Sequence, residues 1–155
     1  MTTLWGALAG GFVGALVVVL GADVAAWARL TRFDIPLLLG SAVFQRRVVG
    51  RAAGYGLHLL LGLAFAAAYR VAGVAGWGEG AVAGLLHGAV AVSVLFPLVL
   101  PLLHPRMALR GDGDRAVVEA PGALVLAYGR WTPPLLLALH VLYGTIVGGF
   151  AGLAA

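Results

Sequence analysis

The sequence predicts an all-α membrane protein, a single transmembrane domain built as a bundle of four membrane-spanning helices. Of its 155 residues, 62% are hydrophobic and only 10% are charged, whereas soluble domains carry about 25% charged residues. Four apolar stretches each provide the roughly 20 residues that a spanning helix needs. The arginines lie in the segments that join these stretches, which is the distribution that orients membrane proteins. A soluble enzyme, a disordered chain and a disulfide scaffold are therefore excluded.

The apolar stretches fix the expected elements in order. The spans are predicted at about residues 4–30, 53–74, 80–103 and 133–154. Pro97 and Pro101 should loosen the last turns of the third span, whereas Pro133 suits the start of the fourth. Tryptophan and tyrosine prefer the headgroup level, and six of them fall at predicted span ends: Trp5, Trp27, Tyr55, Tyr69, Trp77 and Trp131. Tyr143 lies inside the fourth span and does not fit this belt.

The arginines predict the orientation. All ten basic residues are arginine, and all except Arg70 lie in or beside the segments that join spans one to two and three to four. By the positive-inside rule, both long loops should be cytoplasmic and both termini outside. The first span is too long for a signal peptide and no basic residue precedes it, so it should be retained. The arginines are expected to contact lipid phosphates, and no nucleic-acid partner is expected.

The two halves of the chain, about residues 4–74 and 78–155, predict an internal duplication because they share motifs in the same order. The matching motifs are Gly6, Gly10 and Gly14 with Gly80, Gly84 and Gly88, then Asp34-x-Pro36 with Glu119-x-Pro121, then His58-x-x-x-Gly62 with His140-x-x-x-Gly144. Because each half starts and ends outside, the repeats would be parallel helical hairpins about a pseudo-twofold axis. Each would include a cytoplasmic interfacial segment. Asp34 should cap a short helix in the first loop, and residues 111–114 predict a turn in the second.

The matching glycines lie three to a helix face at a spacing of four residues. Small residues at this spacing let helix backbones approach closely in membranes. We therefore expect the two glycine stripes to serve helix packing, within the bundle or in an oligomer.

His58 and His140 are the candidate cofactor ligands. They occupy equivalent positions in the proposed repeat, one to two turns inside the cytoplasmic face, and a pseudo-twofold axis would aim both at the bundle centre. Two inward imidazoles are compatible with axial ligation of a b-type haem. A divalent metal is the other possibility, for which the candidate ligands are His58, His140, Asp34, Glu119 and His104. In the alternative without a cofactor, each imidazole bonds a neighbouring helix. His87 lies toward the outer side without an evident partner and should serve packing or hydrogen bonding.

Asp23 is the only carboxylate inside an apolar run. An intramembrane acid is expensive and usually paired. Asp23 is expected to pair with Arg29 or Arg51, or to reach one of the two histidines. Asp23 could serve either of two roles: a structural ion pair, or a proton-transfer site in a small transporter or channel.

Several ordered motifs resemble a family of small bacterial four-span membrane proteins of unknown function. They are Phe33-Asp34-Ile35-Pro36, Leu57-His58-Leu59, Gly84-Leu85-Leu86-His87-Gly88, His104-Pro105 and His140-Val141-Leu142-Tyr143-Gly144. The resemblance covers nearly the whole chain and implies four helices in a bacterial inner membrane. It implies no activity, and Asp23 is not part of its pattern.

The sequence contains no cysteine, lysine or phosphate-binding loop, and Ser41 and Ser93 lie in no nucleophile motif. We therefore expect a non-catalytic bundle, a structural or accessory subunit of a membrane assembly or a homo-oligomer. The expected partners are the lipid bilayer and other membrane subunits or a second copy. The alternatives are a haem- or metal-binding protein for electron transfer or metal handling, using His58 and His140, and a small proton-coupled transporter or channel.

Overall fold

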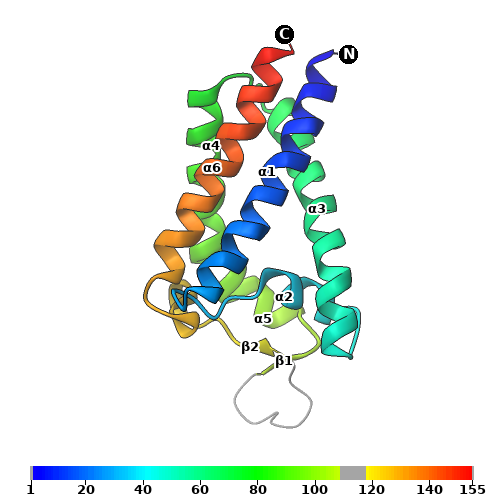
Figure 1. Cartoon of the computed structure of the whole chain (residues 1–155). Helices are drawn as coiled ribbons and strands as arrows, with labels where there is room; N and C mark the ends of the chain where they lie inside the picture. Colours follow the sequence, from blue (N-terminus) through cyan, green and yellow to red (C-terminus); the bar gives the residue numbers. More distant parts are fainter. Residues whose placement is uncertain (1, 109–117, 155) are drawn as a thin grey trace.

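The computed structural model describes residues 2–108 and 118–154. Four long helical segments run side by side, with both chain ends at one end of the bundle and the short elements at the other (Figure 1). These segments are α1 (Thr2–Trp27), α3 (Arg47–Val71), a composite helix from Trp77 to Leu103, and α6 (Thr132–Leu153). Each is long and apolar enough to cross a membrane, which confirms the predicted all-α fold with four candidate spans.

The span boundaries differ most in the second span. α3 begins at Arg47, whereas hydropathy placed the start near residue 53. The first turns carry Arg47 and Arg51, whose long side chains reach polar surroundings while their stems cover apolar surface. Hydropathy therefore detects the apolar part of the helix and misses its charged first turns.

The third span is a composite helix. It consists of α4 (Trp77–Val90), a π-helix η1 (Ala91–Val99) and α5 (Leu100–Leu103). Pro97 lies inside η1 and has no N–H with which to continue an α-helical hydrogen-bond ladder. The loosening predicted from the prolines thus takes the form of a wider helix, a feature that is frequent at functional sites.

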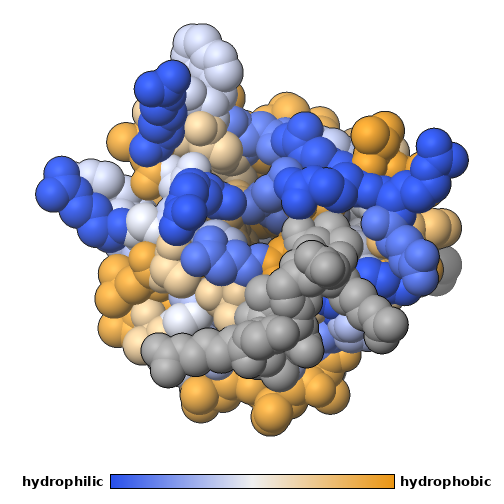
Figure 2. Space-filling view, turned by 90° about the horizontal axis from the view of Figure 1, so that it is seen from below, coloured by the Kyte–Doolittle hydropathy of each residue, from blue (hydrophilic) through white to orange (hydrophobic). Residues whose placement is uncertain are grey.

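Two dissimilar segments close the loop end of the bundle. The first is α2 (Ile35–Ser41), capped as predicted, because the Leu37 amide donates to Asp34 Oδ1 at 2.8 Å. The second contains the short parallel strands β1 (Met107–Ala108) and β2 (Val118–Glu119), then a 3-10 segment η2 (Ala123–Tyr128). The turn predicted at residues 111–114 lies outside the described residues. Hydrophilic residues gather on this end of the molecule (Figure 2).

Helix α6 lies between α1 and α4, and α3 packs against α1 and α2. The glycine stripes explain the close approach to α6. A Cβ added at Gly10 would meet Val147 and Phe150 of α6, and one added at Gly84 would meet the His140 backbone. Both stripes therefore face α6. In a twofold arrangement the stripe on α4 would face α6 and the stripe on α1 would face α3, the second helix of its own half. The members facing α6 are Gly6, Gly10, Gly14, Gly80, Gly84 and Gly88.

Candidate functional site

The four spans and α2 enclose a cavity of about 270 Å³. Its surface is almost entirely apolar, with polar atoms supplied by three histidines and a tyrosine. These polar residues are His58 of α3, His87 of α4, and His140 and Tyr143 of α6. The cavity is the candidate functional site because an apolar pocket with a few convergent polar groups is the usual form of a ligand site.

The histidines lie deep in the spans. His58 is about 16 Å along the axis from the start of α3 at Arg47. This is about three helical turns from the start of α3, because α3 begins earlier than hydropathy indicated. His140 is about 12 Å from the start of α6.

Each of the two expected histidines bonds a backbone carbonyl. His58 Nε2 lies 3.1 Å from the carbonyl oxygen of Ala15, and His140 Nδ1 lies 2.7 Å from that of Leu136. A carbonyl oxygen only accepts, so these two ring nitrogens carry the protons. His58 Nδ1 and His140 Nε2 are then left as acceptors in the uncharged rings.

His87 joins the same site, which sequence reasoning missed. Its ring meets that of His140 edge to face, with centroids 4.8 Å apart, and Tyr69 Oη lies 3.1 Å from its Nδ1. The expectation that His87 serves packing or hydrogen bonding is confirmed, and its partners, which the sequence did not identify, are Tyr69 and His140. The glycine that follows it was the available signal, since Gly88 has no side chain and so leaves room for the Cβ of His140.

Two tyrosines pack inside the bundle. Tyr69, expected at the headgroup level, is buried against His87 and Tyr143. The Tyr143 hydroxyl donates to the Gly62 carbonyl at 2.5 Å, which ties α6 to α3. Tyr143 and His87 line the cavity, and Tyr69 packs behind them.

The free ring nitrogens are accessible. Across residues 2–108 and 118–154, no buried side-chain nitrogen or oxygen lacks a hydrogen-bond partner. His58 Nδ1, His87 Nε2 and His140 Nε2 have no partner among these residues. Each therefore keeps some exposed surface, and all three rings belong to residues that line the cavity.

Partly exposed residues of α3 and η1 line one side of the cavity. Phe65 of α3 reaches α4 through its ring contact with His87, at 4.2 Å between centroids. The lining residues Leu61 of α3 and Leu95 of η1 are 43% and 37% exposed. Both lie well inside their helices, away from the helix ends.

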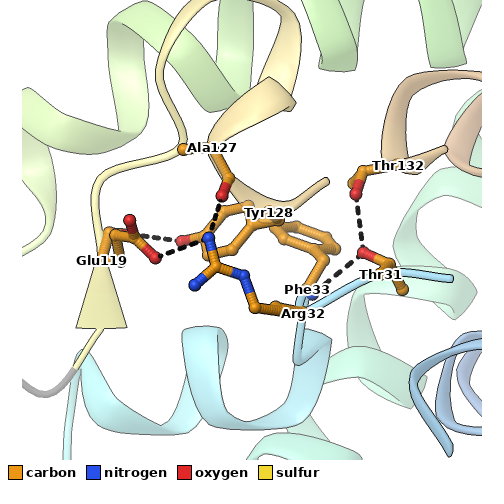
Figure 3. A network of polar contacts seen from close by, with 7 residues as sticks. All are labelled: Thr31, Arg32, Phe33, Glu119, Ala127, Tyr128 and Thr132. Atoms are coloured by element: carbon orange, nitrogen blue, oxygen red, sulfur yellow. Dashed lines mark hydrogen bonds and ion pairs between the residues drawn. The ribbon is translucent and has the colours of Figure 1, made fainter. Parts of the chain in front are cut away.

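Phe33 and α2 line the cavity at the loop end of the bundle. Polar contacts hold this cavity wall in place (Figure 3). Phe33 packs on Phe96 and Tyr128, with ring centroids 5.2 and 5.1 Å apart. The Arg32 guanidinium donates to the Ala127 carbonyl at 2.5 Å and lies 3.5 Å from the Glu119 carboxylate.

Two further hydrogen bonds complete this network. Thr31 and Thr132 hydroxyls lie 2.7 Å apart, and the Tyr128 hydroxyl donates to the Glu119 carbonyl. Burial raises the pKa of Tyr128 to about 12. The α1–α2 connection is thus anchored to η2 and to the start of α6.

The other candidate metal ligands serve structural contacts. Asp34 caps α2 and lies 3.0 Å from Arg51 Nε, and Glu119 pairs with Arg32. His104 Nε2 donates to the Leu38 carbonyl at 2.9 Å, and its Nδ1 accepts from the Arg106 amide at 3.2 Å. Neither nitrogen of His104 is left for a metal. Within the described ranges, no three histidine or carboxylate side chains form a group that could hold a metal ion.

Asp23 lies in a network apart from the cavity. Its carboxylate is 2.9 Å from Arg51 Nη2 and accepts from the Tyr55 hydroxyl at 2.5 Å. Arg51 therefore bridges Asp23 of α1 and Asp34, the cap of α2. Of the expected pairings, the structure shows the one with Arg51.

The cavity gives more support to a small ligand than to a haem. Engineered cavities of roughly 150 Å³ bind benzene, and about 270 Å³ is of the same order. His87 also packs against the His140 ring that would face the iron.

Comparisons with protein-family models, curated proteins and solved structures find no match to this chain.

Proposed function

We propose that this chain is a non-catalytic membrane protein that binds a small lipid-soluble molecule in the cavity between its spans. The observation that carries the proposal is the set of three accessible, unpartnered imidazole nitrogens in an apolar cavity. Polar groups that can find no protein partner in hydrocarbon are costly. A ligand that bonds them offsets that cost.

The partly exposed side of the cavity supports entry from the lipid. Leu61 and Leu95 line it at the depth of the acyl chains, where water is scarce and apolar solutes concentrate. A transporter for polar solutes receives less support, because Asp23 is already engaged by Arg51 and Tyr55.

The proposal includes the location that the arginines and the family resemblance indicate: a bacterial inner membrane, with both termini outside and both long loops cytoplasmic. It also includes the internal duplication. The convergence of both glycine stripes on α6 then means that the halves diverged in packing after they were duplicated.

Fluorine NMR of fluorobenzene tests the binding function. Protein in lipid nanodiscs should bind fluorobenzene above the level of empty nanodiscs. Ala91→Phe should abolish this binding, because Ala91 lines the cavity and is 2% exposed. Leu102→Phe adds the same ring at a position that is 84% exposed and should leave binding unchanged. Binding equal to that of empty nanodiscs would overturn the proposal.

An accessory-subunit role is a second proposal, favoured by the partly exposed side of the cavity along α3 and η1, which a helix of another protein or a second copy would cover. A fixed partner that co-purifies and blocks fluorobenzene until it is removed would support this role. A preparation that binds fluorobenzene without any partner would argue against it.

A further inference from the structure

We infer that the cavity takes a single-ring aromatic molecule bearing a hydroxyl group, a phenol or a hydroquinone. This inference rests on the proposed binding function and names the class of ligand.

The hydrogen-bonding pattern of two histidines selects a donor. His58 uses its Nε2 proton on Ala15 and His140 uses its Nδ1 proton on Leu136. In hydrocarbon the rings stay uncharged, because an ionised group there is expensive. The remaining nitrogens are therefore lone-pair acceptors, and a ligand must donate to them.

The third histidine adds a donor. Among the described residues, the Tyr69 hydroxyl has His87 Nδ1 as its one hydrogen-bond partner. If Tyr69 donates, its own proton is satisfied and His87 carries its proton on the accessible Nε2. A ligand hydroxyl can donate to one imidazole and accept from another, whereas an ether or a ketone only accepts.

Size and lining select the ring. The cavity volume of about 270 Å³ exceeds the roughly 150 Å³ that accommodates benzene by the space of a few substituent atoms. Phe33, Phe65, Phe96 and Tyr143 line it, so a flat ring finds edge-to-face partners on several sides.

A pair of isosteric probes tests the class. Fluorine NMR in nanodiscs compares para-fluorophenol with para-fluorotoluene, which carries a methyl group in place of the hydroxyl. The occupancies of the two probes are compared at equal probe concentration in the lipid. That concentration is measured with empty nanodiscs. The phenol should bind about tenfold more tightly, the scale of a hydrogen bond formed away from water.

His140→Phe should reduce this preference, because it deletes one of the two acceptors and keeps a ring, while para-fluorotoluene still binds. Leu102→Phe should keep the preference. If para-fluorotoluene binds and the phenol shows no advantage, the ligand class is wrong and the binding function stands. If neither probe binds the wild-type protein, both proposals fail. The wild-type comparison decides the matter even where His140→Phe does not fold.

Discussion

His87 and His140 meet edge to face, with ring centroids 4.8 Å apart, because the helices that carry them approach through glycines. A Cβ added at Gly84 or Gly88 would collide with His140 itself. The glycines that let α4 approach α6 therefore also set the spacing of the His87 and His140 rings in the cavity.

Gly54→Ala should destabilise the protein by about 1–3 kcal/mol, the usual cost of overpacking. The added methyl would meet the backbone of Pro36, where α2 docks on α3. Gly56→Ala is the matched control on the same helix, because nothing lies within 4 Å of a Cβ there. Thermal unfolding in nanodiscs measures both. Equal unfolding temperatures for the two variants would contradict the docking of α2 at this position.

Arg51→Gln should lower stability by about 1 kcal/mol, since the ion pairs with Asp23 and Asp34 are partly open to solvent and therefore modest. The loss should shrink at high salt, which screens such pairs. Arg46→Gln removes the same charge from an exposed residue one turn away that shows no ion pair among the described residues. If both substitutions lower stability equally and independently of salt, the ion pairs of Arg51 do not hold α1 and α2 together.

Alkaline pH should weaken the anchor of the cavity wall at Tyr128. Its pKa is about 12 in the folded chain, above the ordinary value of 10.0, because burial disfavours the phenolate. Its contribution to stability is therefore fully present below pH 10 and is lost as the pH rises through about 12. Wild type should lose stability more steeply over this range than Tyr128→Phe. Parallel profiles would contradict the burial of this hydroxyl.

Single cysteines test the proposed orientation, because the chain has none of its own. Val71 and Val48 are exposed residues near opposite ends of α3. A membrane-impermeant thiol reagent applied to intact cells should label Val71→Cys and leave Val48→Cys unlabelled until the membrane is opened. The reverse pattern would place the termini in the cytoplasm.

The four spans and the cap at Asp34 could be predicted, because hydropathy and capping are local properties of the sequence. The pair of Asp23 with Arg51 was among the expected alternatives, and both expected histidines line one cavity. The partners of His87 could not be predicted from hydropathy. Its contacts with Tyr69 and His140 depend on how α4 lies against α3 and α6, and Gly88 was the one local signal for the close approach to α6.

The carboxylates show a second limit of sequence reasoning. Asp34 and Glu119 look like metal ligands because their chemistry is suitable, yet each is engaged by an arginine in the folded chain. Which partner a carboxylate takes is decided by tertiary distances that spacing alone does not give.

Nitrogen NMR of the histidine side chains tests the central claim most directly. We expect opposite tautomers in two uncharged rings, with the proton on Nε2 in His58 and on Nδ1 in His140. Added para-fluorophenol should then shift the unprotonated nitrogen of each ring, with signals assigned from single His-to-Phe variants. Two doubly protonated rings, or protons on the nitrogens that face the cavity, would contradict the account.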